Sequence, residues 1–302
     1  MVFTEGAANK SHWPVGAPAL FSLARAGRRR MLRTFPFSNF RAHGYHKRLT
    51  AFSKMHGSIA QEDVRRAFID TGGLMLTKDQ ISQLFGAELS PLCDQARAIL
   101  AASPHPLLEN EAALLQCPDF YRLGLNLAVL DLAEACLGLD CLYLGATLKC
   151  EKADGRVAGT RQWHLDIEDE RLFRVLLYIA PVTPGGGPFE FFPRRISQTL
   201  KTALHYRSGY VEDARITALA PMQLLEQCTG DAGEAVIFDG AGVFHRGKTP
   251  SSQDRYSITF AYCSRQPLEL RRSARLPAPL HRAFLSTLST RQRSAVPSPH
   301  LF

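Results

Sequence analysis

The sequence predicts a mainly β core, a double-stranded β-helix (jelly roll, cupin-like), with flanking α-helices. Two observations support this fold class. Apolar residues recur at helical spacing in the first half of the chain. The second half contains short apolar segments separated by turns and one insertion, which fits a jelly roll better than alternating strands and helices. With 302 residues, 45% of them apolar, the chain can bury a core of this size.

The helical elements are expected mainly before residue 139. Residues 61–70 predict a short helix that ends at Gly72-Gly73, and residues 74–76 predict a strand after it. Further helices are expected near 78–86, 90–102 and 119–138. The last of these has apolar residues at helical spacing, which predicts a stripe facing the core rather than a site: Leu123, Leu127, Leu130 and Ala133.

Strands are expected after the helices. Their ranges are 141–151, 161–167, 173–181, 189–193, 234–240, 243–247 and 255–263. The run 173–181 is apolar nearly throughout, as in a strand buried on both faces. Residues 195–228 are predicted as a helical or looped insertion between strands, and 276–292 as a terminal helix. The expected domains are a basic N-terminal extension or cap, a β-helix domain with a helical N-terminal part, and a basic C-terminal tail: 1–57, 58–266 and 267–302.

The net charge of +8 is concentrated at the two ends of the chain. Residues 1–60 hold ten Lys/Arg and one acid, residues 265–302 hold seven Arg and one acid, and the part between them carries −7. Basic ends are usually solvated extensions, and the alternative is binding to a polyanion or a membrane surface. Because the central part is acidic, the charge pattern argues against a nucleic-acid substrate.

Seven cysteines occur without any CxxC pair, which predicts reduced thiols in a cytoplasmic protein. The Arg-rich, acid-poor segment from Arg25 to Lys54 leaves organelle import as an alternative. No apolar run reaches the length of about 18 residues that a membrane span needs. The oligomeric state is left open.

A metal site is predicted at His164, Asp166 and His245. His164 and Asp166 are two residues apart, so on an extended strand their side chains project from the same face. His245 lies within a second strand pattern and can supply a third ligand. Two imidazoles and one carboxylate form a facial triad, which leaves adjacent positions of a ferrous ion open for a co-substrate and O2.

Arg255 begins the strand pattern that follows His245, and Ser257 lies two residues further on the same face. A guanidinium at this place can bind a carboxylate with two hydrogen bonds, and the hydroxyl can add a third. The chain has no GxGxxG, Walker or GxSxG motif that would offer a rival account of its chemistry.

These residues resemble the phytanoyl-CoA dioxygenase-like group of Fe(II)/2-oxoglutarate-dependent oxygenases over roughly residues 61–266. The likeness rests on five segments: Phe68 to Thr77, Trp163-His164-Leu165-Asp166, Gly187 to Pro193, Gly233 to Gly240 with His245, and Arg255-Tyr256-Ser257. The chain departs from the group at Arg194-Arg195, where a Gly-Ser-His run is common.

The resemblance implies Fe(II), 2-oxoglutarate and O2 as cofactor and co-substrates. It implies that His164, Asp166 and His245 bind the iron, that Arg255 binds the distal carboxylate of 2-oxoglutarate and that Ser257 assists it. Related halogenases have a small residue in place of the carboxylate ligand, so Asp166 favours hydroxylation or desaturation of an unactivated C–H bond. A small organic substrate is expected, such as a natural-product intermediate or an amino-acid derivative.

Other residues are weaker candidates. Lys149 precedes the predicted metal strand and could reach the co-substrate, although a solvated lysine is the alternative. Trp163 should point away from His164 into the core, whereas Gln162 shares the ligand face. The predicted substrate contacts are Gln162, Tyr143, Arg156, Phe191 and Arg194. The acidic run Glu168-Asp169-Glu170 is predicted as a solvated turn, and three histidines are expected to be structural or on the surface: His56, His205 and His281.

Three alternative functions remain at this level. The sequence Arg255-Tyr256-Ser257-Ile258-Thr259-Phe260 superficially resembles the Arg-containing strand of nucleic-acid demethylases of the alkylation-repair type, but Ala261 stands where a second arginine would be expected. A non-enzymatic cupin-like module could bind a ligand in the barrel. A metal-dependent oxygenase that does not use 2-oxoglutarate would share the triad.

Overall fold

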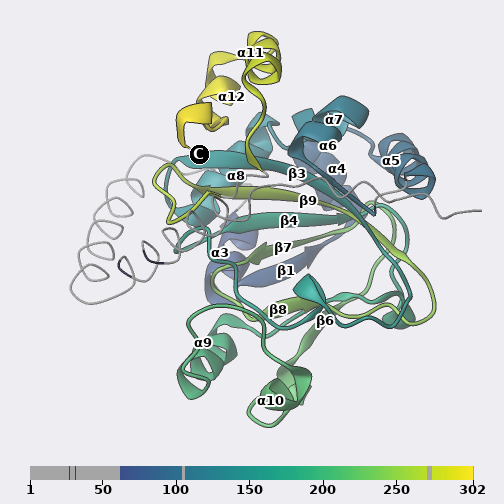
Figure 1. The fold of residues 1–302 in the computed structure, drawn as a ribbon, viewed down its shortest axis with the longest axis vertical. Coiled ribbons are helices and arrows are strands. Elements are labelled where there is room, and N and C mark those ends of the chain that lie inside the picture. Colours follow the sequence, from purple (N-terminus) through teal and green to yellow (C-terminus); the bar gives the residue numbers. More distant parts are fainter. Residues whose placement is uncertain (1–26, 28–30, 32–61, 104–105, 271–273, 302) are drawn as a thin grey trace, which may run out of the picture. The chain divides into compact units, whose positions relative to one another are not determined.

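The computed structural model describes residues 27, 31, 62–103, 106–270 and 274–301. The chain forms two compact units, Met1–Lys47 and Arg48–Phe302. In the first unit, Gly27 and Met31 are described and both are helical. The predicted basic extension at 1–57 therefore lies outside the described residues, apart from these two. All helices and strands labelled in Figure 1 belong to the second unit.

Two antiparallel sheets form the core. The large sheet has the strand order β1-β7-β4-β9-β3-β2, and the small sheet has the order β6-β5-β8. The strands of the large sheet are β1 (Gly73–Leu76), β2 (Leu107–Glu109), β3 (Cys141–Glu151), β4 (Phe173–Tyr178), β7 (Ala235–Asp239) and β9 (Arg255–Ser264). Those of the small sheet are β5 (Phe189–Phe191), β6 (Glu226–Cys228) and β8 (His245–Gly247).

From β3 onward the chain passes repeatedly between the two sheets. After β3 of the large sheet, His164 pairs with His245 of β8 beside the small sheet, and β4 returns to the large sheet. The strands β5 and β6 are in the small sheet, β7 in the large, β8 in the small and β9 in the large. This alternation is the connectivity of a double-stranded β-helix, so the predicted fold class is confirmed.

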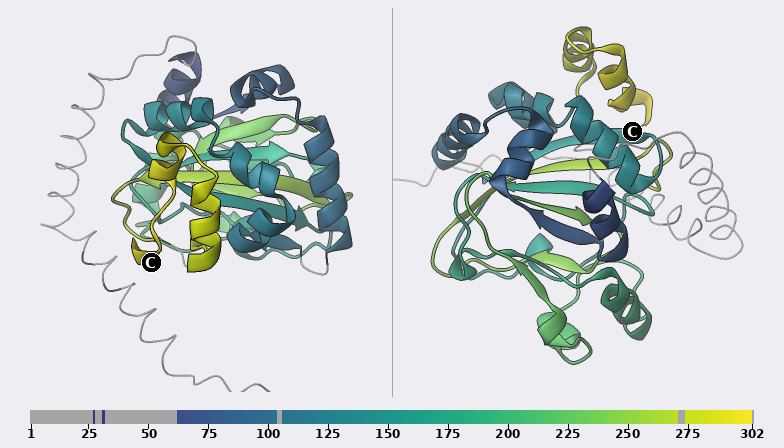
Figure 2. Two further views of the ribbon diagram at one scale, coloured as in Figure 1. Left: turned by 90° about the horizontal axis from the view of Figure 1, so that it is seen from above. Right: turned by 180° about the vertical axis from the view of Figure 1, so that it is seen from behind.

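Helices cover the outer face of the large sheet, as Figures 1 and 2 show. They are α3 (Glu62–Asp70), α4 (Lys78–Phe85), α5 (Ser90–Ala102), α6 (Asn110–Gln116), α7 (Pro118–Leu123), α8 (Leu127–Leu137), α11 (Ala278–Ser286) and α12 (Thr290–Ala295). Their apolar side chains and one face of the sheet share a buried cluster. Within it, the rings of Phe68 and Phe173 lie 5.6 Å apart and those of Phe85 and Phe260 lie 5.7 Å apart. None of the described helices is both long and apolar enough to cross a membrane.

The helix predicted at 119–138 is two helices, α7 and α8. Asn126 starts α8 because its side-chain oxygen accepts a hydrogen bond from the backbone N–H of Ala128 at 2.9 Å. A Cβ on Gly124 would lie 2.5 Å from the Tyr143 ring, so the break also allows the chain to pass close to β3. The helices predicted at 61–70, 78–86 and 90–102 are confirmed as α3, α4 and α5, with boundaries within a residue.

The C-terminal segment packs on the helical layer rather than extending as a tail. It contains two helices, α11 and α12, where one was predicted, because Ser289 forms a capping box with Gln292 and starts a second helix. Phe284 packs edge-on against Tyr121 with centroids 5.3 Å apart. Arg291 forms an ion pair with the buried Glu134 at 2.6 Å. The described part of this segment is therefore built into the domain.

The predicted insertion at 195–228 contains α9 (Arg194–Ala203), α10 (Asp213–Thr217) and the short strand β6. It lies on the side of the small sheet (Figure 1). Sequence reasoning missed β2, β6 and α6, since segments of three to seven residues give little periodicity. The predicted strand at 161–167 is replaced by β-bridges at Trp163 and His164, and Arg161 ends the short helix η2 (Gly159–Arg161).

Candidate metal centre

His164, Asp166 and His245 meet between the two sheets, as the sequence predicted. His164 and His245 face each other across an antiparallel pair and exchange two backbone hydrogen bonds of 3.1 Å. The Nε2 atoms of His164 and His245 each lie 3.8 Å from an Asp166 carboxylate oxygen. One donor atom from each residue fits within 4.8 Å of the others, and this is the one such grouping of His, Cys, Asp and Glu found among the described residues.

Both imidazoles are oriented by the backbone. His164 Nδ1 donates to the carbonyl of Gln162 at 2.9 Å, and His245 Nδ1 donates to the carbonyl of Val243 at 2.9 Å. We assign these tautomers from the hydrogen bonds, because a carbonyl can only accept. This leaves each Nε2 directed toward the carboxylate, and in a neutral ring that atom carries the lone pair that a metal ligand needs. Burial and the neighbouring His164 lower the pKa of His245 to about 3, so its ring is neutral.

Asp166 is held by a cation that the sequence reasoning did not identify. Arg174 of β4 forms ion pairs with Asp166 at 2.6 Å and with Glu168 at 3.2 Å. A Cβ on Gly240 would lie 2.1 Å from Asp166 Oδ2, so this glycine lets the carboxylate approach the backbone. The sequence did indicate that Arg174 has a buried anionic partner, because Arg174 is the one charged residue in the apolar run 173–181.

The opposite face of the metal-bearing segment is fixed by the insertion. Trp163 is 1% exposed, and its Nε1 donates to Asp213 of α10 at 2.7 Å. The Arg246 guanidinium lies 4.5 Å from the Trp163 ring centroid and pairs with Glu190 at 2.7 Å. The prediction that Trp163 packs in the core, away from His164, is thus confirmed.

Arg255 lies beside the triad on the large sheet. It is 4% exposed and contacts two oxygens, the Gly187 carbonyl and the carboxylate of Glu151. A Cβ on Gly247 would lie 2.1 Å from its guanidinium, and Gly247 is two residues after His245. The guanidinium therefore approaches the backbone of β8 near the metal site. Burial lowers the pKa of Arg255 to about 9, which leaves it charged at neutral pH.

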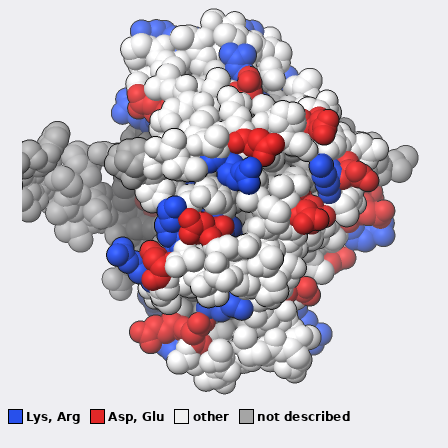
Figure 3. Space-filling model, turned by 90° about the vertical axis from the view of Figure 1, so that its right-hand side faces the viewer, with Lys and Arg blue, Asp and Glu red and all other residues white. Residues whose placement is uncertain are grey.

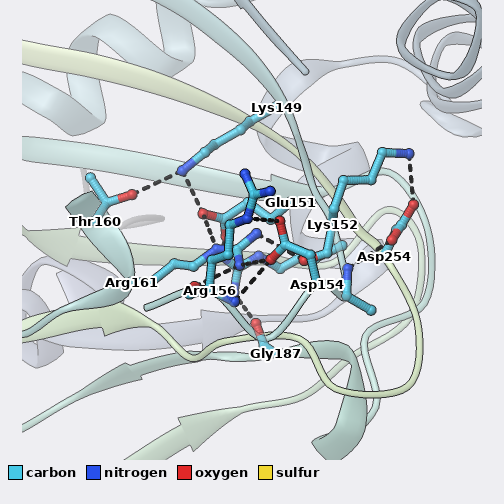
Figure 4. A network of polar contacts seen from close by, with 11 residues as sticks. Lys149, Glu151, Lys152, Asp154, Arg156, Thr160, Arg161, Gly187 and Asp254 are labelled. Carbon is cyan, nitrogen blue, oxygen red and sulfur yellow. Dashed lines mark hydrogen bonds and ion pairs between the residues drawn. The ribbon is translucent and has the colours of Figure 1, made fainter. Parts of the chain in front are cut away.

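Lys149 and Ser257 are neighbours on adjacent strands, β3 and β9, and Ser257 lies on the face that Arg255 shares. Lys149 Nζ contacts Glu151 at 2.5 Å and the Thr160 hydroxyl at 2.9 Å (Figure 4). Burial lowers the pKa of Lys149 to about 8, and the charges of Arg255 and Arg161 act in the same direction. The structure thus brings Lys149 and Arg255 to Glu151, with Ser257 beside Lys149 in the sheet.

Two predicted substrate residues lie toward solvent. Arg156 is on the exposed loop that follows β3, and its side chain is 84% exposed near Asp154 (Figure 4). Gln162 is half-buried, and its backbone carbonyl is the group that orients His164. Both stay predictions as substrate contacts.

Of the other three predicted substrate contacts, Tyr143 faces the helical layer, which contradicts the prediction, whereas Phe191 and Arg194 stay predictions. Tyr143 is buried on the helix-facing side of β3 and donates to the Tyr121 carbonyl at 3.0 Å. Phe191 is 3% exposed in the cluster between the sheets. Arg194 pairs with Asp239 at 2.8 Å and binds the carbonyls at the end of α3. Phe191 lies opposite His245 in the strand register, and the Arg194 side chain is 20% exposed.

The acidic run was predicted as a solvated turn, and this is wrong for two of its members. Glu168 and Asp169 are 3% and 2% exposed. Asp169 accepts a hydrogen bond from the backbone N–H of Ser264 at 2.9 Å, and Glu168 pairs with Arg174. Glu170 is exposed, as expected, and so is His205. His281 is buried in α11, and His56 lies outside the described residues.

Tyr210 is a residue of the site that no pattern in the sequence indicated. Its ring lies edge-on to His164 with centroids 5.4 Å apart, yet the residue is 53% exposed. The next residue, Val211, donates its backbone N–H to the Trp163 carbonyl at 2.8 Å. An exposed aromatic ring is thus fixed beside a metal-ligand candidate, at the solvent side of the site.

No family model matches the chain, and no curated protein matches it. Solved structures with a similar fold include the non-heme alpha ketoglutarate dependent epimerase SnoN from nogalamycin biosynthesis (14% identity, TM-score 0.48, 69% of this chain and 84% of that chain). Another is EctD from S. alaskensis with 2-oxoglutarate and 5-hydroxyectoine (18% identity, TM-score 0.47, 69% of this chain and 76% of that chain). A third is HygX from Streptomyces hygroscopicus with nickel and 2-oxoglutarate bound (14% identity, TM-score 0.47, 70% of this chain and 88% of that chain). With identities this low, the function has to be argued from this chain's own residues.

Proposed function

We propose that this chain is a non-haem Fe(II)/2-oxoglutarate-dependent dioxygenase that hydroxylates or desaturates an unactivated C–H bond of a small organic molecule. The observation that carries the proposal is the convergence of two imidazoles and one carboxylate. Nitrogen and oxygen donors in this combination, without a fourth protein ligand in the group, are typical of non-haem Fe(II) oxygenases.

The residues of the chain fit such a metal. The Nδ1 hydrogen bonds of His164 and His245 direct both Nε2 lone pairs to one point, and Arg174 fixes the carboxylate of Asp166 there. These side chains are buried, so bulk water has little access to the reacting atoms. When bound, Fe(II) with 2-oxoglutarate and O2 would supply the oxidant, and succinate and CO2 would be released.

Arg255, Ser257 and Lys149 are the residues that would hold the distal carboxylate of 2-oxoglutarate. Arg255 offers a charged, planar donor group, and Lys149 and Ser257 lie side by side on the neighbouring strand positions. A buried cationic site of this kind suits a dicarboxylate, because contact with the cations compensates the carboxylate for the hydration that it loses on entering the site.

The substrate would approach from the solvent side, where Tyr210, Gln162 and Arg156 lie. The substrate that we propose is a small organic molecule, such as a natural-product intermediate or an amino-acid derivative. On the face drawn in Figure 3, basic and acidic side chains are interspersed, and the described residues there form no continuous basic surface. This favours the small molecule over the alternative of a nucleic-acid demethylase.

An anaerobic titration tests the proposal. Metal-free protein is mixed with Fe(II) and 2-oxoglutarate, and the weak visible charge-transfer absorption of the complex is followed. We expect the absorption with the wild type, its loss in H164A, D166A and H245A, and its weakening in R255A. H205N serves as a matched control, because it removes an exposed histidine outside the triad while tolerating the positive φ of 48°.

The alternatives give different results. An iron complex without any response to 2-oxoglutarate would favour an oxygenase that does not use this co-substrate. Absence of iron binding would contradict the proposal and favour a non-enzymatic ligand-binding module.

A further inference from the structure

Glu151 places a carboxylate of the protein itself where the co-substrate carboxylate is expected. The residue ends β3, is 2% exposed and lies opposite Arg255 in the strand register. Three cations surround it: Lys149 at 2.5 Å, Arg161 at 3.8 Å and Arg255 in direct contact. They come from β3, from the short helix η2 (Gly159–Arg161) and from β9, so the fold converges on this one carboxylate (Figure 4).

The two oxygens of Glu151 have different partners. Oε1 faces Lys149 and Arg161, and Oε2 faces Arg255. Lys149, Arg161 and Arg255 supply three positive charges, and Glu151 together with Asp154, which pairs with Arg161 at 2.6 Å, supplies two negative ones. Asp154 also pairs with the exposed Arg156 at 3.8 Å, so positive charge is in excess around Glu151 and favours the binding of an added carboxylate.

We propose that Glu151 competes with 2-oxoglutarate for Arg255. In the ligand-free protein it neutralises the buried guanidinium, and on co-substrate binding it leaves Arg255 and keeps Lys149 and Arg161 as partners. This inference rests on the proposed function, since it concerns the same site. It makes Glu151 a residue that sets the affinity for the co-substrate.

The competition follows from the physics of buried charge. An arginine that is 4% exposed is costly without an anion beside it, and Glu151 is the carboxylate in contact with it. The ion pair between Glu151 and Arg255 therefore has to break before the carboxylate of 2-oxoglutarate can bind to Arg255. Lys149 and Arg161 already lie at Oε1, so the Glu151 carboxylate keeps two cationic partners when it leaves Arg255.

Titration calorimetry on protein loaded with Zn(II), which undergoes no oxidation, gives the test. We expect E151Q to bind 2-oxoglutarate at least about tenfold more tightly than the wild type, because a glutamine keeps the size of the side chain but not its charge. Its ligand-free form should melt at a lower temperature than the wild type. 2-Oxobutyrate, which lacks the distal carboxylate, should bind wild type and E151Q equally.

Two further variants complete the experiment. D154N removes an acid from the same network without touching Arg255, and its affinity for 2-oxoglutarate should stay within about threefold of the wild type. E151D shortens the side chain while keeping its charge; it should also tighten binding, and it takes the place of E151Q if that variant does not fold.

The results separate the inference from the function. Unchanged or weaker 2-oxoglutarate binding in E151Q would overturn the inference, because Glu151 would then position Arg255 rather than compete for it. An equal gain for 2-oxobutyrate would overturn it as well. Failure of the wild type and E151Q alike to bind 2-oxoglutarate would refute the proposed function, and the inference with it.

Discussion

Replacing Arg174 by methionine tests how the buried carboxylates of the metal site are stabilised. In the wild type, this side chain is 15% exposed and pairs with Asp166 at 2.6 Å and Glu168 at 3.2 Å. R174M removes this cation from beside two carboxylates whose side chains are 7% and 4% exposed. Breaking a buried pair from one side costs about 3–5 kcal/mol. We therefore expect the metal-free variant to unfold at a temperature lower by about 10 °C.

A divalent metal should restore much of this loss, because it supplies positive charge next to Asp166. The assay is a thermal melt with and without Zn(II) or Mn(II), in which the metal should raise the midpoint of R174M more than that of the wild type. R194M is the matched control. It breaks a buried pair with Asp239, 2.8 Å long, outside the triad, so it should be destabilised without a larger gain from metal. Equal metal-induced shifts in R174M and R194M would refute the reasoning.

Three further predictions concern the same site. The pKa of His245 is about 3 in the folded protein and 6.5 in the unfolded chain, so the unfolded state binds the proton more readily and stability falls as pH drops below 6.5. At pH 5.5, this residue should lower the free energy of unfolding of the metal-free protein by about 1.4 kcal/mol, and denaturant titrations of H245Q should not show this loss. Parallel dependence of the unfolding free energy on pH in wild type and H245Q would contradict the prediction. In G247A, the added Cβ would lie 2.1 Å from the Arg255 guanidinium and displace it. Calorimetry should show 2-oxoglutarate binding weakened about tenfold and metal affinity unchanged. An equal loss of 2-oxoglutarate affinity and metal affinity would show that Arg255 does not bind the co-substrate. Because the pKa of Lys149 is about 8, 2-oxoglutarate affinity should decline between pH 7 and 9, and K149M should abolish that part of the decline; a flat wild-type profile would exclude Lys149 from the site.

The sequence by itself predicted the residues of the candidate metal centre and determined the type of fold. The spacing of His164 and Asp166 gave their common face, because side chains alternate along any extended strand. Short apolar segments and turns gave the jelly roll, and the opposite direction of Trp163 followed from the same alternation. These are local properties, which depend on residues a few positions apart.

The tertiary structure decided which buried charges meet. Glu151 and Arg255 are 104 positions apart, and they pair because β3 and β9 are neighbours in the large sheet. Arg174 reaches Asp166 because the segment after β3 crosses to the other sheet before β4 returns. Sheet order also put Tyr143 on the helix-facing side, away from the site predicted for it. Local periodicity predicts which side chains share a face of a strand. What packs against each face depends on the order of the strands in the sheet, which is set by the packing of the whole chain.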